Sequence, residues 1–409
     1  MMHHTTSLTT KLAYILPVIA ANPFYRHKYG IEDLPVPEAE KYILTHFYEL
    51  PVLTRAEIPH ISRDAADGRS SIMQMTGGTT GAANIIEWCT EDAGKAAIPL
   101  IEAIANAQIP RGSFALSLVT TSLAAYGIHI ELACRQQGLA FIGFNHTDLD
   151  LIETIVRNHA IKVIFGTPAG ILGIVSSTQL RDYLQSVELV ITAGAKITAE
   201  EMHTIESALH CHCISNLGTT ELGAFGMQTS LCDGFHLDSR VIEAEVHHID
   251  KKGIGDCIMT ALLGRRTPII RYECGDRGRI LQSCSCGQSG PILQYHGRKS
   301  ETFFIGGTKI SIETLEAIAR YIGANPTLQA FVFPRETPAR IQLNIVSAPQ
   351  SWTLDTIAHC LLDVNTALRN KLLTGKIRLD IDFIPKEKLV GLNARGKWRR
   401  IIQHPQPDK

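Results

Sequence analysis

The sequence of 409 residues predicts an α/β protein: a large multi-layer N-terminal domain with mostly parallel sheets plus a β-rich subdomain, and a small, mobile α+β C-terminal domain. Three observations lead to this prediction. Short β-branched runs alternate with amphipathic, helix-length stretches between about residues 70 and 230. Strands and tight turns follow from about 236 to 300, and residues 301–409 mix strands with two helices. Such alternation favours parallel strands joined by helical crossovers.

The N-terminal apolar stretch Lys11–Ala21 has the length of a signal-peptide core and one positive charge before it. The segment NPFYRHKYG follows it without a polar spacer, and we therefore interpret the stretch as an amphipathic first helix.

The expected elements of the N-terminal domain follow in order along the chain. Short, turn-bounded runs predict strands at FALSLVTT (114–121), LAFIGFN (139–145), KVIFGTP (162–168), VELVITAGA (187–195) and HCISNLG (212–218). Helical periodicity predicts crossovers such as DLDLIETIVRNHA (148–160) and AEEMHTIESALH (199–210). The subdomain, at about 232–297, would contain strands at VIEAEVHHI (241–249), DCIMTALL (256–263), IIRYE (269–273) and GRILQS (278–283).

The domain boundary is expected after residue 297, with a short hinge near 298–300. The N-terminal domain is then 1–297 and the C-terminal domain 298–409. Strands of the smaller domain are expected at ETFFIGG (301–307), QAFVFP (329–334), RIQLNIV (340–346) and IRLDIDFIP (377–385).

Composition excludes several classes of partner. The 39 basic and 40 acidic residues give a net charge of −1. The chain therefore has no excess of positive charge that would attract nucleic acid or an anionic membrane surface. The sequence has no uninterrupted run of about 20 apolar residues, the length that a membrane-spanning helix needs. The ten cysteines are not spaced like a secreted disulfide framework, and several lie in apolar runs. We therefore expect a cytoplasmic protein with no nucleic-acid or membrane partner.

A glycine- and threonine-rich stretch follows the strand-like SIMQM. It consists of Thr76, Gly77, Gly78, Thr79, Thr80 and Gly81. Glycines let successive N–H groups form a concave phosphate site, and threonine hydroxyls add donors. The lysine of the common nucleotide loop is missing, and an ordinary hairpin turn would have a similar composition. Taken alone, the stretch leaves both interpretations open.

Four further stretches carry polar groups suited to the same chemistry. Glu221 follows a strand on a glycine-flanked turn, where a carboxylate can hold Mg²⁺. Asp276 is expected on a loop between two strands, suited to a ribose diol, and Arg298 at the domain junction. Lys397 lies in a basic stretch near the C-terminal end of the sequence. Taken alone, this stretch is more typical of a solvent-exposed turn.

In this order and at these spacings, the five stretches resemble the adenylate-forming (ANL) superfamily, most closely its phenylacetate–CoA ligase-like branch. The resemblance covers essentially the whole chain. It includes NPFYRHKYG, LPVLTRAEI (50–58), TPAGIL (167–172) and TAGA (192–195).

The resemblance implies roles for individual residues. Thr76–Gly81 would grip the β- and γ-phosphates of ATP, and Thr220 would face the α-phosphate beside Gly218 and Thr219. Glu221 would bind Mg²⁺. Asp276 would bind the ribose hydroxyls with help from Arg298. Lys397 would bridge the carboxylate and the α-phosphate during adenylation, which makes Lys397, Glu221 and Thr220 the expected catalytic residues. The acyl pocket would be bordered by Tyr126, Gly127, Ala193 and Gly194.

The activity implied is that of an ATP-dependent acyl- or aryl-CoA ligase. A carboxylic acid, aromatic or medium-sized and apolar, would become an acyl-AMP and then pass to a thiol, coenzyme A. One alternative is an enzyme that loads a carrier protein or another protein thiol, and a second is a non-catalytic nucleotide-binding scaffold. Relatives are often dimers, which implies a homodimer, and their C-terminal domain rotates between the two half-reactions.

Three positions depart from the pattern of the superfamily. Ala83-Asn84 stands where the wider superfamily has Pro-Lys, Ser300 where relatives often have Asp, and Gly77 where Ser is usual. None of these changes removes a group that the chemistry requires.

Two short Cys/His pairs form a candidate zinc site. Cys232 and His236, with Cys284 and Cys286, could close a tetrahedral Cys₃His site, although spacing alone leaves the pairing open. A similar pattern in phenylacetate–CoA ligase relatives implies a structural Zn²⁺. The rival cluster His210–Cys213 is interpreted as buried strand, because alternate side chains point to opposite faces. His129, His247 and His248 are interpreted as packing or surface residues.

Overall fold

The structure, a computed structural model, describes residues 7–61, 70–75, 84–119, 125–143, 149–264, 266–390 and 400–403. Internal contacts divide the chain into two units. The second unit begins at His296 and includes Gly275–Arg277, and nearly all of the preceding chain belongs to the first. Among the described residues, every helix is too short or too polar to cross a bilayer.

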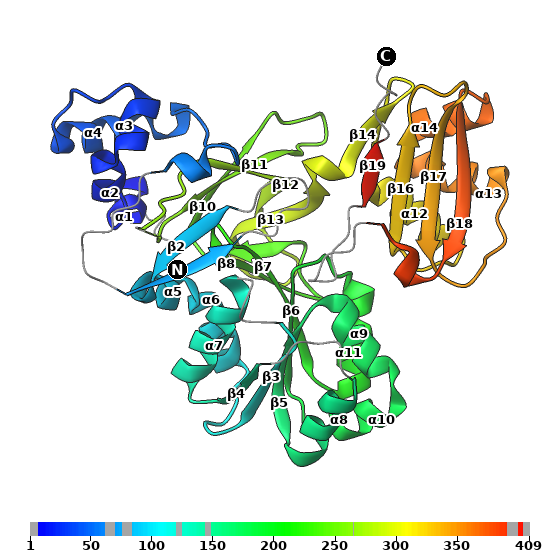
Figure 1. Cartoon of the computed structure of the whole chain (residues 1–409), viewed down its shortest axis with the longest axis horizontal. Helices are drawn as coiled ribbons and strands as arrows, with labels where there is room; N and C mark the ends of the chain where they lie inside the picture. The colour runs from blue at the N-terminus through cyan, green and yellow to red at the C-terminus, as the bar shows by residue number, and fades with distance from the viewer. Residues whose placement is uncertain are drawn as a thin grey trace. The chain divides into compact units, whose positions relative to one another are not determined.

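Parallel strands and their crossover helices form one half of the first unit (Figure 1). The strands are β3 (Phe114–Ser117), β4 (Ala140–Gly143), β5 (Ile161–Gly166), β6 (Leu189–Ala193) and β7 (His212–Thr219). The helices are α5 (Thr90–Ala96), α6 (Ile98–Asn106), α7 (Ala125–Gln137), α8 (Leu149–Asn158), α9 (Pro168–Ser176), α10 (Thr178–Tyr183) and α11 (Ala199–Leu209). Neighbouring strands pair in the order β4-β3-β5-β6-β7, all parallel, which confirms the predicted βα alternation.

Both faces of these parallel strands are buried under helices. Leu189 and Ile191 of β6 pack in a core with side chains of α6 and α7, whereas Val190 packs with α8–α11. Successive strand residues point to opposite faces, so apolar residues at consecutive positions require a helical layer on each side. The apolar runs seen in the sequence therefore fold as the middle of a three-layer arrangement.

Antiparallel strands extend the same sheet. They are β8 (Gly223–Thr229), β9 (Phe235–Leu237), β10 (Ile242–His247), β11 (Gly255–Ala261), β12 (Tyr272–Ser283) and β13 (Ser289–Arg298). The full order is β10-β11-β12-β13-β9-β8-β7-β6-β5-β3-β4, eleven strands in all. The region predicted as a β-rich subdomain thus continues the main sheet from β7, with β8 and β9 pairing antiparallel.

One predicted loop in this region is wrong. Residues 274–277 were expected to separate two strands, with Asp276 on the loop, but β12 runs through them without a break. Gly275 adopts a φ of 80°, which lets the backbone kink while it stays in the sheet. Asp276 therefore lies inside a strand. The predicted buried strand at His210–Cys213 begins only at His212, because His210 caps α11 in a left-handed conformation.

The N-terminal segment is more finely divided than predicted. It contains α1 (Leu8–Leu12), α2 (Leu16–Ala21), α3 (Pro23–Tyr29), α4 (Val36–His46), η1 (Phe47–Glu49) and η2 (Ile58–His60), followed by the hairpin β1 (Ser71–Met75) and β2 (Ile85–Cys89). The single helix expected over Lys11–Ala21 is interrupted at residues 13–15, and Pro17 lies in the first turn of α2. Proline suits that position because its nitrogen needs no hydrogen-bond partner there.

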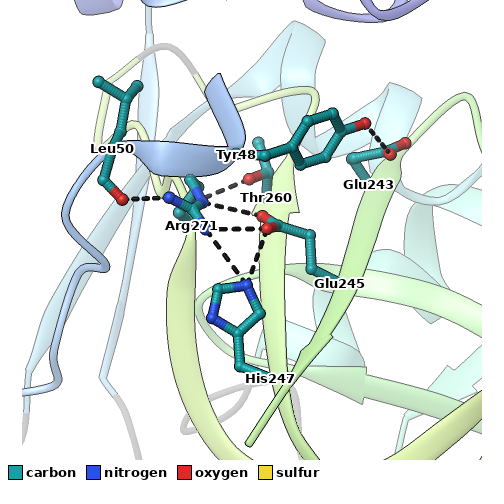
Figure 2. A network of polar contacts seen from close by, with 7 residues as sticks. All are labelled: Tyr48, Leu50, Glu243, Glu245, His247, Thr260 and Arg271. Atoms are coloured by element: carbon teal, nitrogen blue, oxygen red, sulfur yellow. Dashed lines mark hydrogen bonds and ion pairs between the residues drawn. The ribbon is translucent and has the colours of Figure 1, made fainter. Parts of the chain in front are cut away.

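A buried arginine fixes this segment to the sheet (Figure 2). Arg271 donates from Nε and Nη2 to the Glu245 carboxylate, both at 2.9 Å, and from Nη1 to the Leu50 carbonyl. His247 Nε2 lies 3.0 Å from Glu245 and 3.2 Å from Arg271 Nη2. Leu53 then forms a parallel bridge with Tyr272. We call Arg271, Glu245, His247 and the Leu50 carbonyl the arginine network.

The second unit is an α+β structure around a four-stranded sheet of order β18-β17-β16-β19. Its elements are η3 (Lys299–Glu301), β14 (Thr302–Ile305), β15 (Thr308–Ser311), α12 (Ile312–Tyr321), β16 (Leu328–Phe333), β17 (Ala339–Val346), α13 (Leu354–Val364), α14 (Thr366–Leu373), β18 (Ile377–Ile384), η4 (Lys386–Lys388) and β19 (Ile401–Gln403). The described part has three α-helices where the sequence predicted two. α13 and α14 are separate helices because Asn365 ends α13 and its side chain accepts the Leu368 N–H as the N-cap of α14.

Candidate active site

Several predicted site residues meet at the carboxyl ends of two adjacent parallel strands. Ala193 ends β6 and pairs with Asn216 of β7, and Gly194 follows with a φ of 84°. Gly218 and Thr219 end β7, and Thr220 and Glu221 form the turn into β8. Ligands of open α/β sheets bind at this edge. The structure thus brings the predicted nucleotide turn beside two of the predicted acyl-pocket residues.

A hydrogen bond and two glycines constrain the backbone of the turn that contains Glu221. The Thr219 hydroxyl accepts the Leu222 N–H at 3.2 Å. A Cβ on Gly218 would lie 2.6 Å from the Gly223 carbonyl, and Gly223 itself has a φ of 78°. Both glycines are therefore required by the backbone, which explains the glycine-flanked pattern read from the sequence.

Glu221 is 6% exposed, and its carboxylate has no hydrogen bond or ion pair with any residue that the structure describes. Its oxygens are not among the fully buried polar atoms of the described residues, so they are accessible to a cation. Carboxylate oxygen is a preferred ligand of Mg²⁺. The environment of Glu221 therefore fits the predicted magnesium role.

Two aromatic side chains that sequence reasoning did not assign to the site support the turn. The rings of Trp88 and His129 meet edge to face at 5.7 Å, and both are almost fully buried. A Cβ on Gly223 would lie 3.4 Å from His129 and 3.6 Å from Trp88. Burial lowers the pKa of His129 to about 4, so this imidazole is neutral at physiological pH. His129 is a packing residue, as expected, but the place where it packs is the candidate site.

The remaining acyl-pocket residues are located only by their backbone. Tyr126 and Gly127 lie in the first turn of α7, the helix that follows β3 and carries His129 one turn later. Nothing in the sequence marked His129 or Trp88, because an apolar run and a helix face explain both residues equally well.

Asp276 and Arg298 form a pair within the second unit. Arg298 Nε donates to Asp276 Oδ1 at 3.0 Å. Asp276 is 5% exposed, whereas the Arg298 side chain is 43% exposed. The predicted ribose-binding residues are therefore joined to each other, although Asp276 reaches this position from a strand.

Other predicted residues lie outside the described part of the chain. These are Thr76, Gly77, Gly78, Thr79, Thr80, Gly81, Ala83 and Lys397. Asn84 is described, and its side chain donates to the Arg55 carbonyl at 3.0 Å. Ser300 lies in η3, directly after the Asp276–Arg298 pair.

One strand and two turns of the antiparallel half bring the predicted cysteine–histidine cluster together. Cys232 lies between β8 and β9, His236 lies in β9, and Cys284 and Cys286 lie in the turn between β12 and β13. One ligand atom from each of Cys232, His236, Cys284 and Cys286 lies within 4.8 Å of the others. Cys286 Sγ and His236 Nε2 are 3.3 Å apart. Although burial opposes it, hydrogen bonds from the backbone N–H groups of Cys286 and Asp233 lower the pKa of the Cys284 thiol. A thiol whose anion is favoured in this way is a better metal ligand.

These four residues fit a tetrahedral metal. With Zn–S bonds of about 2.3 Å, ligand atoms of a tetrahedron lie about 3.8 Å apart, close to the spacing here. Burial lowers the pKa of His236, which keeps its imidazole neutral and able to coordinate. Three sulfur atoms and one imidazole are the donor set of structural zinc.

No protein-family model and no curated protein matches this sequence. Solved structures do match it. One of 2-hydroxyisobutyryl-CoA ligase, in the postadenylation state with 2-HIB-AMP, is 16% identical with a TM-score of 0.71 over 97% of this chain and 89% of that chain. The anthranilate CoA ligase AuaEII, in complex with anthranoyl-AMP, is 15% identical with a TM-score of 0.58 over 80% of this chain and 64% of that one.

ATP-bound MatB from Rhodopseudomonas palustris gives a similar result, at 14% identity with a TM-score of 0.56 over 81% of this chain and 63% of that chain. The chain has the fold of these proteins. The predicted α/β fold class is thereby confirmed. At such identities the likeness establishes architecture, and the activity has to be argued from the site.

Proposed function

We propose that this chain belongs to the adenylate-forming superfamily and is an AMP-forming acid–thiol ligase of the phenylacetate–CoA ligase-like branch. The observation that carries the proposal is Glu221 on the turn after β7, whose carboxylate has no partner among the residues that the structure describes, in a chain with the fold of CoA ligases. A carboxylate at this turn would bind Mg²⁺, whereas a scaffold that had lost catalysis would have no need of it.

The reaction proposed has two steps. A carboxylate oxygen of the acid attacks the α-phosphorus of ATP, the bond to the pyrophosphate oxygen breaks, and an acyl-AMP forms. A thiol sulfur then attacks the acyl carbon, AMP leaves, and the thiol proton passes to solvent or a base. Both reactants of the first step are anions, so positioning and charge compensation supply most of the rate.

The residues of this chain would act as follows. Glu221 would hold Mg²⁺, which when bound neutralises phosphate charge. Thr220 would face the α-phosphate, Asp276 and Arg298 would hold the ribose, and Lys397 would bring carboxylate and phosphate together. Rotation of the second unit about a hinge near Arg298–Ser300 is part of the proposal.

The acceptor and the acid complete the proposal. Coenzyme A is the preferred acceptor, because a solved complex of 2-hydroxyisobutyryl-CoA ligase contains it together with 2-HIB-AMP. The ligands of the neighbours, 2-HIB-AMP and anthranoyl-AMP, are adenylates of small acids. The Cys232–Cys286 cluster would hold a structural Zn²⁺ that stabilises the antiparallel half. All ten cysteines are free thiols, which favours a reducing, cytoplasmic compartment.

Pyrophosphate release from Mg-ATP, measured across aryl and apolar acids with and without coenzyme A, tests the proposal. Release should require particular acids and rise with coenzyme A. Glu221→Gln should lower it by about 100-fold or more, as loss of a charge-stabilising group does. Glu188→Gln is the control, because Glu188 is an exposed carboxylate paired with Lys162 at 2.5 Å. Acid-dependent release indifferent to coenzyme A would indicate a carrier-protein acceptor, and equal activity of Glu221→Gln would refute the assignment.

A further inference from the structure

A carboxylate of η3 holds the backbone of Arg298, one of the two residues assigned to the ribose. Arg298 directly precedes η3, and its N–H donates to Glu301 Oε2 at 3.3 Å, three residues further along the chain. Glutamate makes the same contact from the third position of a helix that it caps. From this backbone position the Arg298 side chain reaches Asp276, where its Nε donates to Oδ1 at 3.0 Å. Glu301 is therefore connected to Asp276 through one residue.

The second oxygen of Glu301 faces an arginine that lies directly before β19. Arg400 Nη1 lies 3.6 Å from Glu301 Oε1, and the same guanidinium forms an ion pair with Glu316 of α12. Glu316 also pairs with Arg320 at 3.3 Å. Burial raises the pKa of Glu301, and Arg400 is the strongest of the groups that oppose this shift. The arginine thus offsets part of the cost of placing a charged carboxylate here.

The residue before Arg298 lies against two carboxylates. Gly297 adopts a φ of 79°, and a Cβ there would collide with the Glu313 carboxylate and lie 3.6 Å from Glu301 Oε2. Glycine permits both this backbone conformation and this close approach. Glu301 and Glu313 therefore lie close together, although like charges repel each other. This repulsion disfavours folding, so the benefit of a carboxylate at position 301 lies in the backbone contact that it makes with Arg298.

The exposure of Arg298 explains why its backbone has to be held. Its side chain is 43% exposed, whereas Asp276 is only 5% exposed. A long, half-exposed side chain loses little rotamer freedom through packing, so its direction depends on where its backbone is fixed. We propose that Glu301 is a positioning residue for the ribose of ATP, because it holds Arg298 where the guanidinium meets Asp276. The inference rests on the proposed function, in which Asp276 and Arg298 hold the ribose.

Nucleotide binding tests this role without an acid substrate. Mg-ATP and Mg-2′,3′-dideoxy-ATP, which lacks both ribose hydroxyls, are titrated calorimetrically into the full chain. The parent should bind ATP about 10- to 100-fold more tightly, because the dideoxy nucleotide loses hydrogen bonds to a charged group. Asp276→Ala should bind both nucleotides within about twofold, and Glu301→Ala should keep a preference of about threefold or less. Glu301→Gln retains an oxygen for the Arg298 N–H and should lie between Glu301→Ala and the parent.

The ratio of the two affinities separates positioning from general damage to the protein. A loss of stability or of phosphate binding weakens both nucleotides equally and leaves the ratio unchanged. Glu336→Gln is the matched control, because Glu336 is an exposed carboxylate of the same unit, paired with Arg340 at 2.7 Å. This variant should prefer ATP to the dideoxy nucleotide as strongly as the parent does.

The outcomes separate this inference from the proposed function. Unchanged discrimination in the folded Glu301 variants would overturn the positioning role and leave the proposed function intact. A parent chain that binds neither nucleotide, or binds both equally, would refute the ribose role of Asp276 and the role of Glu301 with it. Discrimination that Glu301→Ala abolishes, in a chain that releases no pyrophosphate with any acid, would refute the ligase reaction and keep the assignment of Glu301.

Discussion

The antiparallel half of the main sheet contains two polar clusters, and their charges are balanced in different ways. The arginine network is complete in itself: the Arg271 cation meets the Glu245 carboxylate and the Leu50 carbonyl. The cysteine–histidine cluster places three sulfur atoms and one imidazole nitrogen together. Among the described residues, no Lys or Arg forms an ion pair with Asp233, which is next to Cys232 in the chain.

The difference concerns where the balancing charge comes from. In the arginine network the balancing charge is part of the chain, so the contact forms when β10, residue 50 and residue 271, just before β12, meet. Thiolates packed together repel one another and need a cation that the chain does not contain. The arginine network therefore needs no ion from the medium, whereas the stability of the cysteine–histidine cluster should depend on the metal concentration in the medium.

The largest expected effect follows from removing the arginine. Arg271→Met leaves Glu245 buried without its cation, and loss of one partner of a buried pair costs about 3–5 kcal/mol. Urea unfolding should show this loss with and without a chelator. Arg240→Met is the control, because Arg240 is half exposed and its pairs with Glu102 and Asp238 should be worth about 1 kcal/mol or less. Equal losses in both variants would contradict a special role for the network.

Added metal should change only the stability that the cysteine–histidine cluster contributes. With free Zn²⁺ held at about 100 times the dissociation constant, the parent chain should gain about 2.7 kcal/mol of stability, and a chelator should remove it. Cys286→Ser should abolish the gain and the bound zinc, measured by elemental analysis. Cys360→Ser, at a half-buried thiol outside the cluster, should retain both. A parent chain that remains metal-free after reconstitution would show that the cluster holds no zinc.

The smallest change in stability is expected at the hydrogen bond between Tyr48 and Glu243, next to the arginine network. Tyr48 donates to Glu243 at 3.1 Å (Figure 2). Glu243 also forms an ion pair with Lys11. Burial, followed by Glu243, raises the pKa of Tyr48 to about 12. The neutral phenol is therefore favoured in the folded state, and this contribution is present below pH 10 and lost as pH rises through 12. Tyr48→Phe should lower stability by less than about 1 kcal/mol at pH 8.

The stability gap between Tyr48→Phe and the parent should narrow between pH 10 and pH 12. Unfolding free energies of both chains at pH 8 and at pH 11 check this expectation. A gap that stays constant would show that the hydroxyl of Tyr48 contributes nothing through Glu243.

Local patterns in the sequence predicted most of the framework. The parallel strands and their crossover helices have strong periodicity, and the Glu221 turn has glycines that its backbone requires. The predicted loop at Gly275 and Asp276 was wrong. These residues have a composition typical of turns, but they lie within strand β12, which pairs with its neighbours in the sheet. The second unit has three α-helices where two were expected, and two of them are separated only by Asn365, which ends one helix and caps the next.

The sequence by itself determined the residue types, their order and the elements that carry them. Glycine at 218 and 223, the carboxylate at 221 and the four cysteine and histidine residues of the cluster can all be read without coordinates. Tertiary structure decided which of them meet. Trp88 and His129 lie under the Glu221 turn, and Gln329 binds Val390 from 61 residues away. Such contacts depend on how distant segments pack, and local periodicity carries no information about that packing.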